Sequence, residues 1–572
     1  MAGGLLNIVS VGNNNAILTG NPTKTFFKVT YSKYSNFGLQ KFRIDYNGLR
    51  ELRLNEQSTF SFKIPRYADL LMDTYIVVTL PDIWSPIHHP TSTSDTTPGT
   101  LFRWVPYEFR WIKNIGTHMI KEIEITCGSM TLQKYSGEYI AAMVERDFSE
   151  EKKKLFNKMT GNIIELNDPA NSGTRINSYP SAYYSTSSDG AEPSIRGRNL
   201  YIPLNSWFTL NNGSAFPLIA LQYNELNINV TMRPIRELFQ VRDPYDYQNY
   251  YPYMQPDFNQ SQFQMYRFLQ TPPAVNISSD SYQNKVSTWN ADIHLMATYC
   301  FLSKEEATLF AAKDQVYLIK DIHQYTFENI TGTKKLKIDT NGMVASWMWY
   351  LQRNDANLRN EWSNYTNWPY RNLPRDIDIY RDATVIRDNN NNPINAIIVS
   401  TVNSGEVESQ PNLNPEDNQP TGISTTGTYA VENRKHILET MGILLDGEYR
   451  ENILTHGIYE YIEKYTRTKG NAEDGLYCYN FCLNTNPFDY QPSGAINLSK
   501  FKNIELELTT YIPPIDDVNS QFDVICDLDG NTIGIRKSNW RLYDYNYNLV
   551  LFEERYNVLS FIGGNCGMLY AK

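Results

Sequence analysis

The sequence predicts an all-β protein of two consecutive β-sandwich domains, with a few inserted short helices and long loops. Apolar and polar residues alternate over many short segments, as in half-buried strands. The 572 residues are enough for two large all-β domains. In addition, one strand pattern occurs at residues 223–230 and again at 501–508, nearly half the chain apart. In both places an aromatic residue and two polar residues precede alternating apolar and polar residues, which fits a duplicated sandwich.

The alternation also locates individual strands. In the first half, the predicted strands lie at residues 27–31, 60–64, 74–80 and 123–127. The segment 74–80 is a continuous β-branched run, which is typical of a central strand covered on both faces. Near the C-terminus, the apolar face of a further strand is formed by Tyr543, Tyr545, Tyr547, Leu549 and Leu551.

Two turns and three helices interrupt these strands. Asn341-Gly342 lies between apolar runs and predicts a tight hairpin. Asp388 and the asparagines before Pro393 predict another reversal. The predicted helices are residues 137–159, with Ile140, Val144 and Phe148 on one stripe; residues 304–312, with Ser303 as the cap and Glu306 three residues on; and residues 448–465.

Long loops and a change of composition suggest how the chain is divided. Residues 81–106, 166–198 and 400–435 are rich in Pro, Ser, Asn, Gly or Thr, and they are either functional loops or simple insertions. A Tyr-, Gln-, Asp- and Pro-rich stretch after Arg236 marks a boundary. We expect an N-terminal arm (1–25), a first sandwich (26–236), a linker (237–283) and a second sandwich (284–572).

Composition argues against several classes of protein. The net charge is −10, whereas nucleic-acid binding usually needs a basic patch. The densest basic run, Lys152 to Lys154, follows two glutamates and is therefore interpreted as a solvated helix face. We expect no direct nucleic-acid binding. The 41 tyrosines fit extensive interfaces, or simply the preference of strands for aromatic residues.

The cysteines and the N-terminus bear on the compartment. Six scattered cysteines form no CxxC motif and suit folding in a reducing compartment. Polar residues interrupt the apolar N-terminus and no charge precedes Lys24, so we expect no signal peptide. The second residue is Ala, which excludes the myristoylation motif. No apolar run reaches the about 18 residues of a spanning helix.

Searches for catalytic and metal motifs find nothing specific. There is no P-loop, no GxSxG elbow and no HExxH. Of the seven histidines, only His88 and His89 are close in sequence. Neighbouring residues on a strand point to opposite faces, so the two rarely bind one metal ion together. A solvent-exposed pair in a loop is the better interpretation. Residues 527–531 resemble the start of a calcium loop but lack its later glutamate, so a β-turn explains them more simply.

Two further residue groups are less informative. Asp516 and Asp517 could in principle serve a glycosidase, but an acid pair is common by chance among 62 acidic residues. Four tryptophans could form a sugar-stacking platform, although packing or subunit contact is favoured by their setting between strands: Trp347, Trp349, Trp362 and Trp368. We therefore expect no catalytic, cofactor-binding or metal-binding residues and no enzymatic activity.

Several blocks of the chain resemble the major capsid proteins of nucleocytoplasmic large DNA viruses, most closely the mimivirus-like branch. The opening segment contains LTGNP followed by TFFKV, and residues 199–232 resemble the block that closes the family's first jelly roll. QPSGAINLSKFKNIEL is similar to a motif of the second jelly roll, and residues 556–570 are similar to the last strand and its Gly-rich tail. The blocks span nearly the whole chain in the expected order. The long 400–435 segment departs from the shorter members of the family.

This resemblance implies two eight-stranded jelly rolls and a structural role. It implies a homotrimeric capsomer that mimics a hexagon, tiles icosahedral facets over an inner membrane and meets neighbouring capsomers, minor capsid proteins and penton proteins. The protein would then belong to the virion and assemble in the cytoplasm of the infected cell, with the N-terminal arm toward the capsid interior. The alternative is a carbohydrate-binding or carbohydrate-active β-sandwich with a concave site lined by aromatic and acidic residues, because a fold alone does not fix a function.

Overall fold

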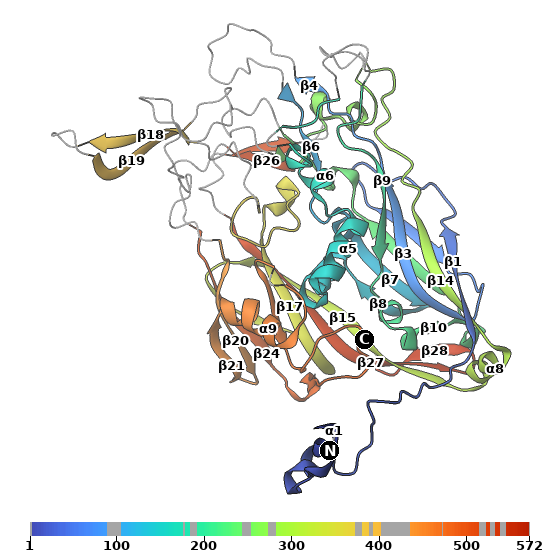
Figure 1. The fold of residues 1–572 in the computed structure, drawn as a ribbon. Helices are drawn as coiled ribbons and strands as arrows, with labels where there is room; N and C mark the ends of the chain where they lie inside the picture. The colour runs from blue at the N-terminus through green and yellow to red at the C-terminus, as the bar shows by residue number, and fades with distance from the viewer. Residues whose placement is uncertain are drawn as a thin grey trace.

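A computed structural model describes residues 3–570, except 89–104, 176–177, 183–190, 243–252, 273–281, 372–379, 388–392, 402–434, 472, 514–521, 527–531 and 538–544. Two lobes lie side by side in it, one from each half of the chain (Figure 1). Each lobe is a sandwich of two antiparallel sheets. The predicted two-sandwich architecture is confirmed. No helix of the described residues is long and apolar enough to span a bilayer.

The first sandwich pairs the beginning of its segment with the end. Its larger sheet has the order β1-β14-β3-β10, and β9 also pairs with β3. These strands are β1 (Phe37–Asp45), β14 (His294–Leu302), β3 (Leu70–Leu80), β10 (Phe216–Pro217) and β9 (Arg198–Pro203). The facing sheet has the order β2 (Ser58–Lys63), β11 (Leu226–Met232), β7 (Ile120–Cys127) and β8 (Met130–Tyr135).

The second sandwich repeats this plan. Its larger sheet has the order β15-β27-β17-β22, with β23 paired to β17 and β28 to β27. These strands are β15 (Gln315–Ile330), β27 (Tyr547–Ile562), β17 (Met343–Arg353), β22 (Leu476–Asn480), β23 (Ile496–Asn497) and β28 (Asn565–Met568). The facing sheet has the order β16 (Thr333–Lys337), β24 (Ile504–Thr510), β20 (Leu438–Leu445) and β21 (Glu448–Thr455).

The strand pattern that repeats in the sequence occupies equivalent places in the two sandwiches. β11 lies between β2 and β7, and β24 lies between β16 and β20. Both strands alternate buried and half-buried residues over seven positions, because each has one face on a core. In both halves the first strand also pairs with the last long strand, β1 with β14 and β15 with β27. The repeat is therefore a real duplication of topology.

One strand lies outside the domain to which the sequence assigned it. β14 falls in the predicted second sandwich (284–572), yet it pairs with β1 along its whole length and with β3 on its other side. By sheet pairing, the first sandwich ends after Leu302 rather than at the predicted boundary. A composition change marks where periodicity weakens, and the chain here returns to the first sheet only after the weakly periodic stretch.

Most predicted strands are present, and two predictions are wrong. Residues 60–64, 74–80 and 123–127 fall within or at the ends of β2, β3 and β7, and the face formed by Tyr545 to Leu551 is buried, whereas Tyr543 lies outside the described residues. Residues 27–31 form no strand, because they precede β1 and have no strand to pair with; Phe27 is 98% exposed.

Asn341-Gly342 is not a hairpin turn, since β16 and β17 belong to different sheets. β18 (Tyr380–Arg387) pairs with β19 (Pro393–Thr401), as the predicted reversal requires, although its turn lies outside the described part.

The helices follow the predictions in part. Residues 137–159 form two helices, α4 (Gly137–Asp147) and α5 (Glu150–Thr160), because Phe148 is extended; its side chain is buried with Ile140 and Val144 as predicted. The Ser303 hydroxyl caps α8 (Lys304–Ala312) by accepting the Glu306 N–H at 3.4 Å. The predicted helix 448–465 is wrong in its first part, which is strand β21; the π-helix η12 (Ile458–Ile462) and α9 (Glu463–Arg467) follow.

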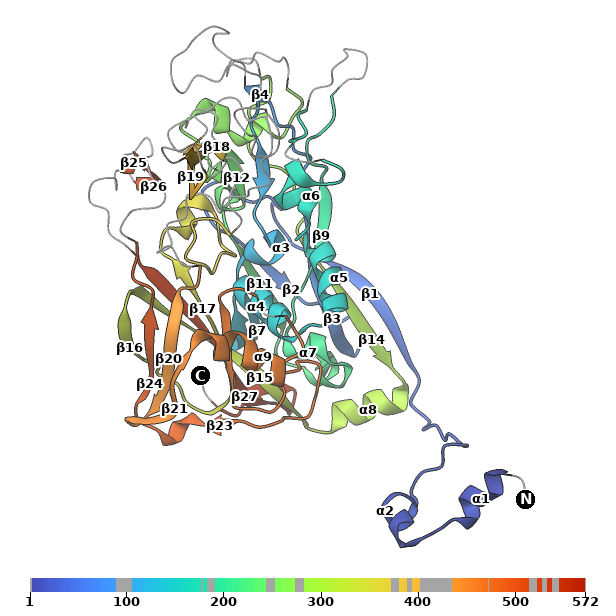
Figure 2. The same cartoon turned by 60° about the vertical axis from the view of Figure 1, so that its left-hand side comes forward.

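Smaller elements lie at the two ends of the molecule. The upper end in Figure 1 carries β4 (Ile87–His88), β6 (Phe109–Trp111), the β18–β19 hairpin and β26 (Thr532–Lys537). Three of these strands have a paired neighbour there: β5 (Val105–Pro106) pairs with β4, β12 (Phe239–Arg242) with β6 and β25 (Phe522–Cys526) with β26. β13 (Tyr253–Met254) pairs in turn with β12. At the opposite end the N-terminal segment, with α1 (Gly3–Val9) and α2 (Ala16–Thr19), leaves the body as an arm (Figure 2).

Candidate functional site: the seam and the exposed surfaces

A continuous apolar core crosses the seam between the two sandwiches. The larger hydrophobic cluster combines the first sandwich with side chains from β15, β17, β22 and β27 of the second. The ring of Tyr139 in α4 meets Phe552 of β27 edge-on, with 5.7 Å between centroids. Phe216 and Phe561 make a similar contact at 5.3 Å. Separating the lobes would expose these side chains to water, so apolar burial holds the lobes in one arrangement.

Arg146 is the polar centre of this seam. Its guanidinium is 1% exposed and donates two hydrogen bonds to Asp147, at 2.9 and 2.6 Å. It also donates to Glu554 Oε1 at 2.8 Å and to the Ser346 hydroxyl at 3.0 Å. Arg146 and Asp147 end α4 of the first sandwich, whereas Glu554 and Ser346 lie on β27 and β17 of the second. One side chain therefore links both lobes.

Glu554 is held as a charged group within this network. Its carboxylate accepts hydrogen bonds from the Tyr139 and Ser346 hydroxyls, both at 2.9 Å, and the Lys320 ammonium lies 3.8 Å away. Burial on its own would raise the pKa of Glu554, but Arg146, Lys320 and the hydroxyl donors lower it to about 2. The ion pair with Arg146 is thus complete at neutral pH.

Backbone contacts close the same seam. The Gly470 N–H donates to the Arg146 carbonyl at 2.8 Å, and a Cβ atom on Gly470 would clash with the Glu145 carbonyl oxygen. Only glycine permits this approach. The Thr485 hydroxyl donates to Asp147 at 2.6 Å, so a second loop of the second sandwich also contacts the end of α4.

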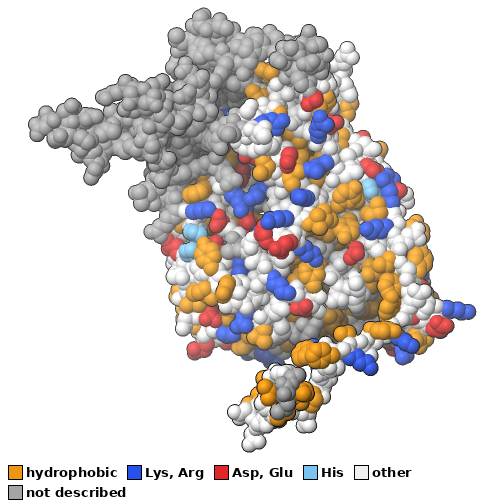
Figure 3. Space-filling model, in the orientation of Figure 1, with side chains coloured by type: hydrophobic (Ala, Val, Ile, Leu, Met, Phe, Trp, Pro, Cys, Tyr) orange, Lys and Arg blue, Asp and Glu red, His pale blue; other side chains and the backbone are white. Residues whose placement is uncertain are grey.

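Exposed apolar side chains concentrate on the N-terminal arm. In the space-filling view, hydrophobic side chains cover much of the arm below the body, while charged side chains of both signs are scattered over the body (Figure 3). Highly exposed large apolar side chains include Ile17 and Leu18 of the arm and, in the stretch between the arm and β1, Phe26, Phe27 and Val29. A surface of this kind on a segment that leaves the body is typical of a contact with another molecule.

The candidate residues from the sequence that the structure describes lie in separate places. His88 lies in β4, paired with β5, and His89 lies outside the described residues, as do Asp516, Asp517 and residues 527–531. Trp347 and Trp349 are fully buried in the core of the second sandwich, and the Trp347 indole donates to Glu553 at 2.7 Å.

The remaining tryptophans and the cysteines are also structural. The indole of Trp362 donates to the Glu237 carbonyl at 3.0 Å, and Lys435 lies over the ring of Trp368. Packing therefore accounts for these tryptophans better than sugar stacking. The five described cysteines are free thiols.

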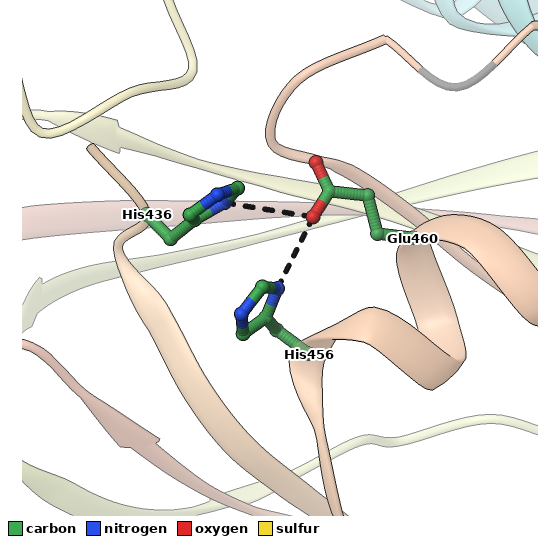
Figure 4. Close-up of side chains that lie close together, drawn as sticks. All are labelled: His436, His456 and Glu460. Atoms are coloured by element: carbon green, nitrogen blue, oxygen red, sulfur yellow. Dashed lines mark hydrogen bonds and ion pairs between the residues drawn. The ribbon is translucent and has the colours of Figure 1, made fainter.

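A histidine pair and a buried glutamate form a cluster that the sequence analysis missed. His436 precedes β20, and His456 and Glu460 lie at the start of the helix that contains η12 (Figure 4). The two Nδ1 atoms lie 3.5 and 3.2 Å from the same oxygen, Oε2 of Glu460. The i,i+4 spacing of His456 and Glu460 on a helix is a signal that could have been found, whereas the approach of His436 needs the fold.

Two family models match the chain in sequence order. Residues 25–295 match the model described as "Major capsid protein N-terminus", and residues 306–567 match "Large eukaryotic DNA virus major capsid protein". The chain belongs to the major capsid protein family of large eukaryotic DNA viruses. This is a family of structural proteins that form the capsid shell, so the capsid protein is a component of the virion and is not an enzyme.

Individual relatives of the capsid protein agree with this family assignment. The major capsid protein of Phaeocystis pouchetii virus is 24% identical over 99% of each chain. That of Paramecium bursaria Chlorella virus 1 is 23% identical over 100% of each chain. Capsid protein 1 of Acanthamoeba polyphaga mimivirus is 29% identical over 61% of this chain and 48% of its own length.

Solved structures confirm the fold of the capsid protein as a double jelly roll. PBCV-1 VP54, fitted into a reconstruction of the virophage Sputnik, covers 96% of this chain and 100% of its own, with a TM-score of 0.57 and 19% identity. The Faustovirus major capsid protein covers 98% of both chains, with a TM-score of 0.56 and 12% identity. The alternative of a carbohydrate-active enzyme does not fit a structural family.

Proposed function

We propose that three copies of this chain form a pseudo-hexagonal capsomer, and that these capsomers tile the facets of an icosahedral shell. The duplicated topology carries the proposal. Each chain supplies two sandwiches with the same order of strands in both sheets. Three such chains place six similar lobes around one axis, and closed rotational symmetry lets every copy use the same interface.

The buried seam supports this arrangement. A hexagonal outline requires the two lobes of a chain to keep a fixed position relative to one another. The continuous core and the Arg146 network provide that constraint, since both cross from one sandwich to the other. Loops at the upper end are then free to differ between lobes without changing the sandwich geometry.

The N-terminal arm would face the capsid interior. There its exposed apolar side chains would contact minor capsid and penton proteins or the surface of an inner viral membrane. Direct binding of the genome is not part of the proposal, because the chain carries a net charge of −10. Free cysteines fit assembly in the reducing cytoplasm of the infected cell.

Native mass spectrometry combined with negative-stain electron microscopy tests the capsomer. We expect a particle of three times the chain mass that has a hexagonal outline in projection. A chain that stays monomeric or dimeric at micromolar concentration would contradict the proposal.

A variant lacking residues 1–36, which removes the arm and the exposed stretch between it and β1, serves as the control for the arm. The arm leaves the body, so the trimer should persist without it, whereas binding to liposomes or to co-expressed minor capsid proteins should be lost. If the truncated chain became monomeric instead, the arm rather than the sandwiches would hold the trimer together.

A further inference from the structure

We propose that His436, His456 and Glu460 bind a divalent transition-metal cation of the zinc class. The three side chains come from two separate segments: His436 lies two residues before β20, and the other two lie on the helix after β21. Their ligand atoms all lie within 4.8 Å of one another. A bound cation would tie the start of β20 to the helix that follows β21.

The two distances to Glu460 match a tetrahedral site. Zinc bonds to imidazole nitrogen and carboxylate oxygen are about 2.0–2.1 Å long, which places neighbouring ligand atoms of a tetrahedron about 3.3 Å apart. Here Oε2 of Glu460 lies 3.5 Å from Nδ1 of His436 and 3.2 Å from Nδ1 of His456. The two imidazole rings stack with 4.4 Å between centroids and 25° between planes, so binding requires a rotation that turns both lone pairs toward one point.

Glu460 is oriented as a metal ligand would be. Its side chain is 0% exposed, and its other oxygen, Oε1, accepts the Gly475 N–H at 2.9 Å. One oxygen is thus fixed by the backbone while the other faces the two imidazoles, an outer-shell arrangement that is common at metal sites. The glutamate also lies within the π-helix Ile458–Ile462, and π-turns inside helices are frequent at functional sites.

The two histidines are the ion-pair partners of Glu460, and Lys464 acts on its charge only from a longer distance. Within the described part of the chain, its ion-pair partners are His436 and His456, and no Lys or Arg lies within 4.0 Å of its carboxylate. The ammonium of the nearby Lys464 is bonded to the Leu476 carbonyl. Buried carboxylates are normally paired with a cation or bound to a metal. A divalent cation between the three ligands supplies that charge.

The donor atoms select the class of metal. Two imidazole nitrogens and one carboxylate oxygen suit Zn²⁺ and its neighbours, whereas Ca²⁺ and Mg²⁺ prefer oxygen ligands alone. The two histidine side chains are 34% and 30% exposed, so a cation can enter from solvent and water can take the fourth position.

Metal titration of the full-length, untagged capsid protein tests the site. After EDTA treatment and buffer exchange without thiol reductants, calorimetry with ZnCl₂ should show one site per chain. Co²⁺ should give the visible absorption bands of a tetrahedral site without an intense thiolate charge-transfer band. His436→Gln and His456→Gln should each weaken binding at least about tenfold and abolish the Co²⁺ bands.

A matched control is available elsewhere in the chain. His323 is partly exposed and lies 3.2 Å from Asp321, but it forms one histidine–carboxylate pair without a second imidazole. His323→Gln should leave the stoichiometry and affinity unchanged. Thermal unfolding in EDTA shows whether each variant is folded.

Two results would overturn the proposal: no stoichiometric Zn²⁺ binding by the wild-type chain, or binding that survives both substitutions at His436 and His456. A thiolate band in the Co²⁺ spectrum would place the metal at cysteines instead. If the variants did not fold, anomalous scattering at the zinc edge from soaked wild-type crystals would decide, since a peak must lie between the three side chains.

Discussion

Replacing Arg146 by Met removes the charged link between the two sandwiches while keeping a side chain of similar length. The substitution takes away four hydrogen bonds: two to Asp147, one to Glu554 and one to Ser346. The carboxylates of Asp147 and Glu554 stay buried without their guanidinium partner. Lys320 remains 3.8 Å from Glu554, whereas Asp147 loses its ion pair with Arg146.

The magnitude follows from the burial of the pair. Removing one partner of a buried ion pair costs about 3–5 kcal/mol, because an uncompensated charge stays in a poorly solvated place. If opening of the seam becomes easier by that amount, hydrogen-exchange protection at the seam falls roughly 150- to 5,000-fold, since a tenfold change corresponds to about 1.4 kcal/mol. The loss should appear in peptides from α4 and β27.

Hydrogen exchange with mass spectrometry is the appropriate assay, because a chain of this size does not unfold in one step. Arg353→Met is the matched control. Arg353 is equally buried and bonds to Asp355 and the Asn367 carbonyl, all within the second sandwich. The Arg353→Met substitution should lower hydrogen-exchange protection in β17 and leave the protection of α4 unchanged. Protection in α4 that falls less than about tenfold in Arg146→Met, or equally in both variants, would refute the role of Arg146 in the seam.

The effect should depend on pH in a defined direction. In the wild type the pKa of Glu554 is about 2, below its ordinary value of 4.5. A lowered pKa contributes stability above the ordinary value, and that stability is lost as pH falls from 4.5 toward 2. Without Arg146, burial raises the pKa of Glu554, so the carboxylate takes up a proton at a higher pH. The difference between wild type and variant should therefore be larger at pH 7 than at pH 5.

Three further outcomes follow from the structure. Ile228→Ala in β11 and Leu506→Ala in β24 remove fully buried side chains at equivalent places, so each should destabilise its own sandwich by about 2–5 kcal/mol, measured as peptide-resolved hydrogen exchange. Gly470→Ala forces a Cβ atom against backbone carbonyls, and should cost about 1–3 kcal/mol in the same assay, with the loss confined to the seam. Limited proteolysis of the isolated capsomer should cleave within residues 20–36 first, and a protease-resistant arm would show that it is already bound.

The strands that the sequence located correctly each have at least one face buried against a core. In β2, β11 and β24, and in β7 from Ile123 onward, the apolar residues alternate with polar ones, and each strand pairs with at least one neighbour in its sheet. The alternation within residues 27–31 is just as regular, yet no strand pairs with it. Periodicity reports which face could be buried, and pairing decides whether it is.

The turns show why local signals need the topology. Asp446-Gly447 joins β20 and β21 with positive φ at both residues, 50° and 89°, which is the geometry that Asp-Gly favours in a two-residue hairpin. The helical interpretation of residues 448–465 overlooked this signal. The dipeptide Asn341-Gly342 is an equally strong hairpin signal, and Gly342 does have a positive φ of 81°. Its turn, however, leads from one sheet to the other.

The duplicated sheets and the seam place different demands on the sequence. Equivalent strands such as β11 and β24 need only the same alternation, so similar residues recur and the duplication can be read from the chain. The seam joins α4 of the first sandwich to β17 and β27 of the second, and it lies outside the repeated strand pattern of residues 223–230 and 501–508. Arg146 and Glu554 are 408 positions apart and become partners only when both lobes have formed. The two lobes therefore have similar sheets. The contacts that hold them together are specific to α4 of the first sandwich and to β17 and β27 of the second.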